Sequence, residues 1–265
     1  MPRVLAAVSA VVLLATFGVS ARPSPGEPDA LRILTYNIHH GEGMDGVFDL
    51  YRVAEVVMAE WPDLVALQEV DQATQRSGGV RQANELSALT GLGVAFGKAM
   101  DYDGGEYGIA ILSRWPMLHV ENRPLPRADG MEPRTALTVE VAPPNSARHV
   151  LFTTTHLDQG RDAGNRLLQA DHLNRLLAKT DTPSILAGDM NSRVDTDVIQ
   201  TLRSLWNDMF VEPPADPAQR PRYRVDYVMA RPAPRWRTVE ARAIEAPGVS
   251  DHRPVLAVLE LEPRD

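Results

Sequence analysis

The segment LAGDMN, residues 186–191, is the stretch of sequence on which the predicted fold and site both depend. The apolar run Ile185–Ala187 predicts a buried strand, and Gly188 at its end allows the backbone to pass close to a bound group. Asp189 and Asn191 are two residues apart, so their side chains leave the strand end on the same side. A carboxylate and an amide in this arrangement can orient a water molecule beside a metal and a phosphate. Both residue types are also common in turns and helix caps, so the prediction needs support from other segments.

Similar apolar runs divide the rest of the chain into alternating strands and helices. We predict strands at residues 31–36, 64–67, 93–98, 108–113, 117–122, 135–141, 149–155, 185–187, 223–229 and 254–261. Helices are predicted at 49–61, 82–90, 161–179 and 196–209, and a proline-rich loop at 213–221. This alternation predicts a single α/β domain in which two mixed β-sheets pack together with helices outside.

Polar residues end the apolar runs at six places, namely Asn37, Glu69, His156, Asp189 with Asn191, Asp226, and Asp251 with His252. Strand ends gather at one edge of a sandwich, where sites are commonly built. Two like charges about 4 Å apart repel by roughly 4 kcal/mol at an effective dielectric of about 20. A divalent cation would relieve this repulsion, and oxygen-rich ligands favour Mg²⁺, Mn²⁺ or Ca²⁺ over zinc.

These segments together resemble the endonuclease/exonuclease/phosphatase superfamily. The motifs that carry the resemblance are YN at 36–37, LQE at 67–69, THL at 155–157, GDMN at 188–191, VDY at 225–227 and SDH at 250–252. They occur in the family's order and span about residues 31–261. The resemblance implies a four-layer α/β sandwich that hydrolyses phosphoester bonds with a divalent metal.

The resemblance also implies a role for each site residue. Glu69 would be the principal metal ligand, with Asn37 and Asp251 near the same ion. The catalytic residues would be His156, Asp189, Asn191, Asp226 and His252. Asp189 would orient or deprotonate the attacking water, and Asn191 would hold water or a phosphate oxygen. Asp226 would fix the ring of His252, and both histidines would bind phosphoryl oxygens. Which group takes the proton from the water is left open.

Four further residues, His39, Arg76, Tyr107 and Arg166, are predicted to line the substrate pocket. The two arginines are the cations that we expect to contact phosphate. The family often has Asn where Ile109 stands, and the abasic-site enzymes carry an acidic residue where this chain has His39. These departures concern the metal geometry and the substrate class rather than the phosphoester chemistry.

The composition limits the surroundings in which the protein works. The 265 residues carry a formal net charge of -8 and no cysteine, so no overall basic field attracts nucleic acid and no disulfide is possible. Residues 1–21 have a positive start, an apolar run and a small-residue cleavage site, which predicts a secretory signal peptide. Residues 22–30 are predicted to be a flexible leader, and residues 31–263 the catalytic domain. We expect a secreted or periplasmic protein, with an uncleaved membrane anchor as the alternative.

The leading functional hypothesis is a metal-dependent phosphodiesterase that acts by in-line attack of an activated water. Alternatives within this class are an endonuclease on DNA or RNA, a phospholipid or sphingomyelin phosphodiesterase, and a small-molecule phosphatase. A non-catalytic binding protein on the same scaffold is a different class, and we would expect it to have lost Glu69, Asp189 or His252. An unrelated barrel hydrolase would need histidine pairs at metal spacing, and residues 37–40 offer only an adjacent pair. No obligate protein partner is evident, and a monomer is expected.

Overall fold

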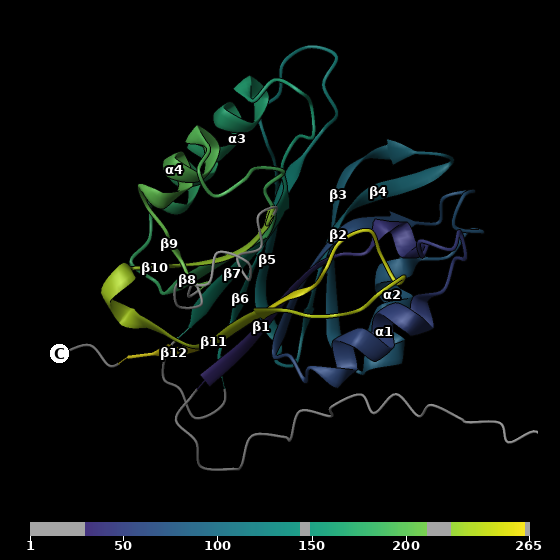
Figure 1. Ribbon diagram of the computed structural model, residues 1–265, viewed down its shortest axis with the longest axis horizontal. Helices are drawn as coiled ribbons and strands as arrows, with labels where there is room; N and C mark the ends of the chain where they lie inside the picture. Colours follow the sequence, from purple (N-terminus) through teal and green to yellow (C-terminus); the bar gives the residue numbers. More distant parts are fainter. Residues whose placement is uncertain (1–29, 144–148, 211–223, 263–265) are drawn as a thin grey trace, which may run out of the picture.

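The computed structural model describes residues 30–143, 149–210 and 224–262. Two six-stranded mixed sheets pack face to face (Figure 1). The first sheet has the order β11-β12-β1-β2-β4-β3, and the second has the order β5-β6-β7-β8-β10-β9. Helices α1 and α2 cover the outer side of the first sheet, whereas α3 and α4 cover that of the second. This confirms the predicted four-layer α/β sandwich.

The strands of the first sheet are β1 (Ala30–Asn37), β2 (Leu64–Gln72), β3 (Gly93–Tyr102), β4 (Gly105–Ser113), β11 (Trp236–Ala243) and β12 (Val255–Leu261). Those of the second sheet are β5 (Met117–Pro124), β6 (Thr135–Val141), β7 (Val150–His156), β8 (Ser184–Asp189), β9 (Asn207–Asp208) and β10 (Asp226–Arg231). The helices are α1 (Leu50–Ala59), α2 (Gln82–Thr90), α3 (Gly164–Leu177) and α4 (Asp197–Arg203), with short 3₁₀ turns η1 (His39–Gly41) and η2 (Ala233–Arg235). Among the described residues, no helix is long and apolar enough to span a membrane.

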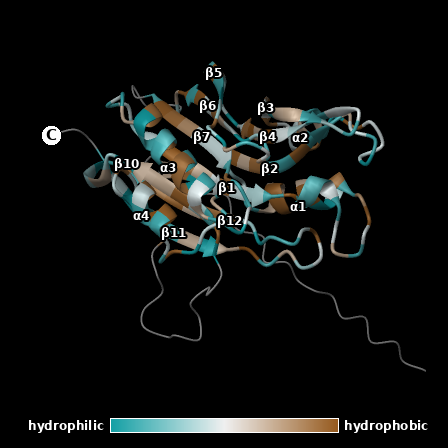
Figure 2. Ribbon diagram, turned by 90° about the horizontal axis from the view of Figure 1, so that it is seen from above, coloured by the Kyte–Doolittle hydropathy of each residue, from teal (hydrophilic) through white to brown (hydrophobic). Residues whose placement is uncertain are grey.

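Three apolar layers hold the sandwich together. The central layer lies between the sheets and includes Ile33, Ile111, Phe152 and Ile185, all fully buried. The other two layers lie beneath the two pairs of helices. Apolar residues accordingly run along the strands and along the inner sides of the helices (Figure 2). Burial of this apolar surface is the main force that holds the strand ends in fixed positions.

Strand pairing places the predicted site residues at one edge of the sandwich. β1 runs parallel to β2, and β7 runs parallel to β8, so their carboxyl ends point the same way. In the second sheet, His156, Asp189 and Asp226 are paired across three neighbouring strands. In the first sheet, Asn37 pairs with the residue before Glu69. Each sheet therefore presents one row of polar residues at the same edge.

Gly188 makes a close approach, but to a neighbouring strand. Its φ is +151°, and a Cβ atom added there would lie 2.0 Å from the carbonyl oxygen of Thr155 in β7. The sequence predicted that Gly188 lets the backbone pass close to a bound group. Instead, the absence of a side chain lets β8 pack against β7 and brings Asp189 beside His156.

Two parts of the second half differ from the predicted elements. The helix predicted at 196–209 ends at Arg203, because Asp208 pairs with Met229 of β10 and binds Arg203 and Arg224. β11 is absent from the predicted strands, since Arg237, Glu240 and Arg242 interrupt its apolar pattern at the edge of the sheet. The predicted signal peptide (1–21), the predicted leader up to residue 29 and the predicted loop at 213–221 lie outside the described residues.

Candidate active site

Asn37 joins the two sheets at the centre of the site. Its side-chain amide donates to Glu69 Oε1 at 3.0 Å and to Asp189 Oδ2 at 3.2 Å. Asn37 and Asp189 are almost wholly buried, whereas Glu69 is half-buried. One amide thus brings a carboxylate of the first sheet next to a carboxylate of the second. The predicted convergence of these three residues is observed.

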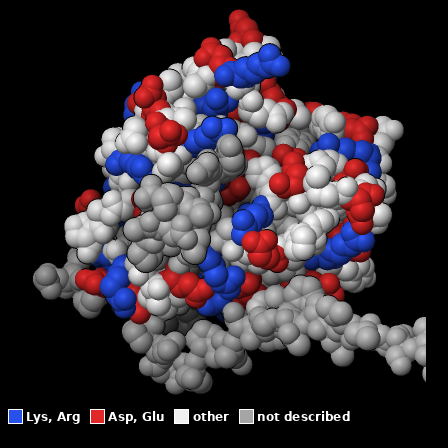
Figure 3. Space-filling model, in the orientation of Figure 1, with Lys and Arg blue, Asp and Glu red and all other residues white. Residues whose placement is uncertain are grey.

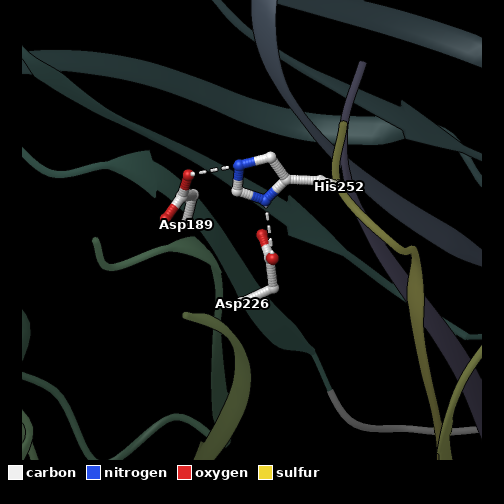
Figure 4. A group of neighbouring side chains, drawn as sticks. All are labelled: Asp189, Asp226 and His252. Carbon is white, nitrogen blue, oxygen red and sulfur yellow. Dashed lines mark hydrogen bonds and ion pairs between the residues drawn. The ribbon is translucent and has the colours of Figure 1, made fainter. Parts of the chain in front are cut away.

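His252 lies between two aspartates of the second sheet (Figure 4). Its Nδ1 is 2.9 Å from Asp226 Oδ2, and its Nε2 is 3.6 Å from Asp189 Oδ2. Burial disfavours the charged ring, but the hydrogen bond and charge of Asp226, followed by the charge of Asp189, raise the pKa of His252 to about 9. The ring is therefore protonated at neutral pH, and the predicted pair of Asp226 and His252 is in hydrogen-bond contact.

Asp189 is poised to exchange a proton near neutral pH. Burial, and then the negative charge of Asp226, raise its pKa to about 7, while His252 and the bonds from Asn191 and Asn37 oppose the rise. Its Oδ1 accepts the backbone N–H of Asn191 at 2.8 Å. A carboxylate with a pKa near the working pH is suited to general-base catalysis. His252 is protonated and cannot serve as the base.

Asn191 holds His156 in one tautomer. The Asn191 amide donates to His156 Nε2 at 3.0 Å and to the Leu157 carbonyl at 2.9 Å, so Nε2 is an acceptor and the proton lies on Nδ1. Burial, reinforced by Arg134 and His252, lowers the pKa of His156 well below its usual value, so the ring is neutral. With its amide hydrogens engaged, Asn191 has Oδ1 left, an acceptor that suits a water hydrogen rather than a phosphate oxygen.

The residues predicted to hold a metal lie beside this group. Glu69 has a φ of +58° at a bulge in β2, a strained conformation of the kind found at functional sites. The Ser250 hydroxyl donates to the Asn37 carbonyl at 2.8 Å and approaches Asp251 Oδ1 at 3.3 Å. Glu69 and Asn37 are thus in direct contact, and Asp251 is linked to the same strand end through Ser250. Their carboxylate and amide oxygens are donor types that suit Mg²⁺, Mn²⁺ or Ca²⁺.

A second arrangement of possible ligands is less suitable for an ion. One ligand atom each from Asp189, Asp226 and His252 lies within 4.8 Å of the other two. The positive charge between these carboxylates is already supplied by the protonated ring of His252. Glu69, Asn37 and Asp251 therefore stay the predicted metal ligands, and Asp189, Asp226 and His252 form a group joined by one hydrogen bond and one ion pair.

The four residues predicted to line the substrate pocket have different surroundings, and some of them are engaged in contacts within the protein. The backbone N–H of His39 donates to Asn37 Oδ1 at 3.1 Å, which sets it beside the cluster. Tyr107 is buried in β4, where burial and the charge of Glu69 raise the pKa of its hydroxyl. Arg166 donates to the carbonyls of Asp158 and Gly160, so its observed contacts hold the loop after β7. Arg76 forms a fork with the buried Asp71.

Arg134 is a candidate site residue that the sequence analysis missed. Its side chain is 2% exposed and lies 3.3 Å from Glu132, while Nε and Nη1 have no hydrogen-bond partner among the described residues. Its charge acts on both His156 and Tyr107, so it lies beside the cluster. The sequence did contain a signal for Arg134. β6 runs antiparallel to β7, so the start of β6 lies beside the end of β7, and a polar residue just before β6 reaches the same edge as His156.

We expect Arg134→Gln to weaken the binding of inorganic phosphate about tenfold or more, because a charge-assisted hydrogen bond contributes about 1.5–3 kcal/mol. Isothermal titration calorimetry measures this dissociation constant directly. Arg123→Gln is the matched control, since Arg123 is half exposed and paired with Glu121 on β5. Equal phosphate affinities in the wild type and Arg134→Gln would contradict the assignment.

Comparisons with known proteins identify the family and the fold of this chain. A sequence model described as the Endonuclease/Exonuclease/phosphatase family matches residues 34–252. The uncharacterized protein YbhP of Escherichia coli K12 is 28% identical over 179 residues, which cover 64% of this chain and 70% of that protein. The crystal structure of an endonuclease/exonuclease/phosphatase from Beutenbergia cavernae has a TM-score of 0.73 at 26% identity, covering 88% of this chain and 72% of that chain. The human nocturnin catalytic domain with bound sulfate shares the fold, with a TM-score of 0.70, 20% identity, and coverage of 89% and 96%.

Proposed function

The chain belongs to the endonuclease/exonuclease/phosphatase family, whose members hydrolyse phosphoester bonds, and we propose that it is a divalent-metal-dependent phosphodiesterase. The observation that carries this proposal is the buried carboxylate of Asp189, which lies between the His252 ring and the Asn37 amide that also binds Glu69. A base and a cation held 3.6 Å apart suit attack by water on an anionic ester.

The side chains support in-line attack of water in the following way. Asp189 accepts the proton of the attacking water, and Asn191 Oδ1 accepts its other hydrogen and so fixes its orientation. His252 donates toward the phosphoryl oxygens, where negative charge accumulates. Arg134, the residue before β6, supplies a second cation, and its Nε and Nη1 have no acceptor among the described residues. Fixed donors aimed at developing charge are a major source of catalytic rate.

A divalent ion at Glu69, Asn37 and Asp251 would polarise the ester and offset the negative charge of the surrounding carboxylates. Family members generally depend on divalent metals, and oxygen donors favour Mg²⁺ or Mn²⁺, with Ca²⁺ as a further possibility. Glu69 holds its place through Asn37, whose amide it accepts at 3.0 Å. This bond keeps the ligand set close to the proposed base.

The substrate and location of the enzyme are also part of this proposal. The substrate is a phosphoester from nucleic acid, a phospholipid or a small diester, and the protein acts as a monomer outside the cytoplasm. On the face shown in Figure 3, acidic and basic side chains are interspersed, which argues against tight sequence-independent binding of duplex DNA. A non-catalytic binding protein is disfavoured because Glu69, Asp189 and His252 are all retained.

We expect the mature chain to hydrolyse bis(4-nitrophenyl) phosphate in Mg²⁺ or Mn²⁺, and excess EDTA to reduce the rate at least a hundredfold. Release of 4-nitrophenolate is followed by its absorbance, and activity should return when the metal is added back in excess. Glu69→Gln should need a higher metal concentration for half-maximal rate, whereas Glu85→Gln on α2 should not. Full turnover in EDTA would refute metal dependence.

A further inference from the structure

Arg76 is held in a fixed orientation at the edge of the site. It lies in the loop after β2, where Nε donates to Asp71 Oδ2 at 2.7 Å and Nη2 donates to Asp71 Oδ1 at 2.8 Å. Asp71 is fully buried, and Thr74 Oγ1 donates to it at 2.7 Å. Gln82 Oε1 accepts the backbone N–H of Asp71 at 2.9 Å. The carboxylate that orients the arginine is therefore itself immobilised.

The hairpin formed by β3 and β4 also contacts Arg76. The guanidinium carbon lies 4.6 Å from the ring centre of Tyr102 and 5.7 Å from that of Tyr107. The backbone N–H of Arg76 donates to Asp103 Oδ2 at 2.6 Å. Stacking and ion pairing together leave the guanidinium little rotational freedom. Such preorganisation lowers the entropy cost of binding a ligand.

One edge of this guanidinium remains open. Arginine has five N–H donors in a planar fork, and Asp71 accepts from Nε and from one side of Nη2. The terminal edge, formed by Nη1 and the outer Nη2 hydrogen, has no acceptor among the described residues. This edge can bind two oxygens of a tetrahedral or planar anion. Asp71 already neutralises the positive charge of Arg76. The free N–H groups would therefore recognise an anion by the direction of their hydrogen bonds rather than by net charge.

The open edge lies next to the proposed catalytic residues. Tyr107 lies 5.7 Å from the Arg76 guanidinium, and burial raises the pKa of its hydroxyl while Glu69 and Arg134 are close enough for their charges to act on it. Burial lowers the pKa of the His40 ring, and the nearby charge of Arg76 lowers it further. A substrate seated at Arg134 and extending over Tyr107 would therefore reach Arg76.

We propose that Arg76 determines specificity by binding a second phosphate group of the substrate, separate from the phosphate that is hydrolysed. This inference rests on the proposed function and adds to it the class of substrate, a phosphoester with a further phosphate nearby. The second phosphate has two possible sources. It belongs either to a small bisphosphate or to the next nucleotide of a single-stranded nucleic acid.

The test compares ligands that differ by one phosphate. Isothermal titration calorimetry in EDTA, where no hydrolysis is expected, measures the affinities of thymidine 5′-phosphate, thymidine 3′,5′-bisphosphate and a thymidine tetranucleotide. Arg76→Gln removes the fork, and Arg76→Lys keeps a cation near Asp71 but cannot bind two oxygens in the same way. Arg114→Gln is the matched control at the opposite end of the sheet, because Arg114 also pairs with an aspartate, Asp63, and stacks on an aromatic ring.

We expect the wild type and Arg114→Gln to bind the bisphosphate at least tenfold more tightly than the monophosphate. Both Arg76 variants should reduce this ratio to about one to two while leaving the monophosphate affinity within about threefold. Dependence on Arg76 for the bisphosphate alone assigns a small substrate, and equal dependence for the tetranucleotide assigns a nucleic acid strand. An unchanged ratio in both Arg76 variants, or equal losses for all three ligands, would overturn the inference. These affinities are measured without turnover, so inactivity toward bis(4-nitrophenyl) phosphate would count against the proposed function alone.

Discussion

Replacing Asp189 with asparagine is expected to lower kcat for phosphodiester hydrolysis by about 10³–10⁴-fold, the upper range for loss of a positioned general base. Asparagine retains the size of the side chain and can still accept the N–H of Asn191, which is 2.8 Å from Oδ1 in the wild type. It cannot take a proton from water. The substitution removes a buried negative charge that Asp226 opposes, but it also removes the acceptor of the Asn37 amide and the ion pair with His252, so its effects on stability oppose each other.

Steady-state kinetics with bis(4-nitrophenyl) phosphate and a thermal unfolding curve separate these effects. Asp195→Asn is a suitable control, because Asp195 is exposed six residues farther along the chain. The melting temperature of Asp189→Asn should stay within a few degrees of that of the wild type, which shows that the variant is folded. If kcat fell less than tenfold, another group would have to accept the proton, and our account of the base would be wrong.

Replacing Asp226 with asparagine should lower kcat by about 10²–10⁴-fold, by analogy with the loss of a carboxylate that orients a catalytic histidine. Asp226 supplies the hydrogen bond that most favours the charged ring of His252 and helps raise its pKa to about 9. Without that carboxylate, the pKa should fall, and the ring should become neutral at a lower pH. Titration of the His252 resonances by NMR measures this change directly.

The sign of the accompanying pH effect on stability follows from the same pKa. His252 has a folded-state pKa of about 9, above its usual value of 6.5. The raised pKa of His252 therefore contributes its full stability below about pH 6.5, and this contribution is lost as the pH rises through 9. In Asp226→Asn, the free energy of unfolding should fall by a smaller amount with rising pH than in the wild type, and this fall should occur at lower pH. If Asp226 acts through His252, then Asp226→Asn in a His252→Gln background should cost little further activity.

The strongest fold predictions come from segments whose local signals and tertiary contacts agree. α2 spans the predicted 82–90 and ends at Gly91, whose φ of +71° suits glycine. α1 begins after Asp49, whose side chain accepts the N–H groups of Tyr51 and Arg52. By contrast, β9 depends on pairing with β10, and β11 on pairing with β12, so neither has a sufficient pattern of its own.

The site was predictable as a set of strand ends, but its hydrogen bonds were not. Spacing along the chain placed Asn37, Asp189 and His252 at strand ends and loops, and the register of the sheets brought them together. Sequence alone did not reveal that the Asn191 amide is occupied by His156 and Leu157. Nor did it reveal Arg134, whose importance depends on burial beside His156 rather than on a neighbouring motif.

The order of the strands has a consequence for how the polypeptide acquires its native state. Every strand of the second sheet comes from between Met117 and Arg231, whereas the first sheet draws β1 and β12 from opposite ends of the domain. Joining β1 to β12 closes a loop of more than two hundred residues, as the pairing of Thr35 with Val255 shows. Contacts so distant in sequence are slow to form. His252 lies three residues before the start of β12, so during refolding catalytic competence would emerge with this late closure, after much of the second sheet had already formed.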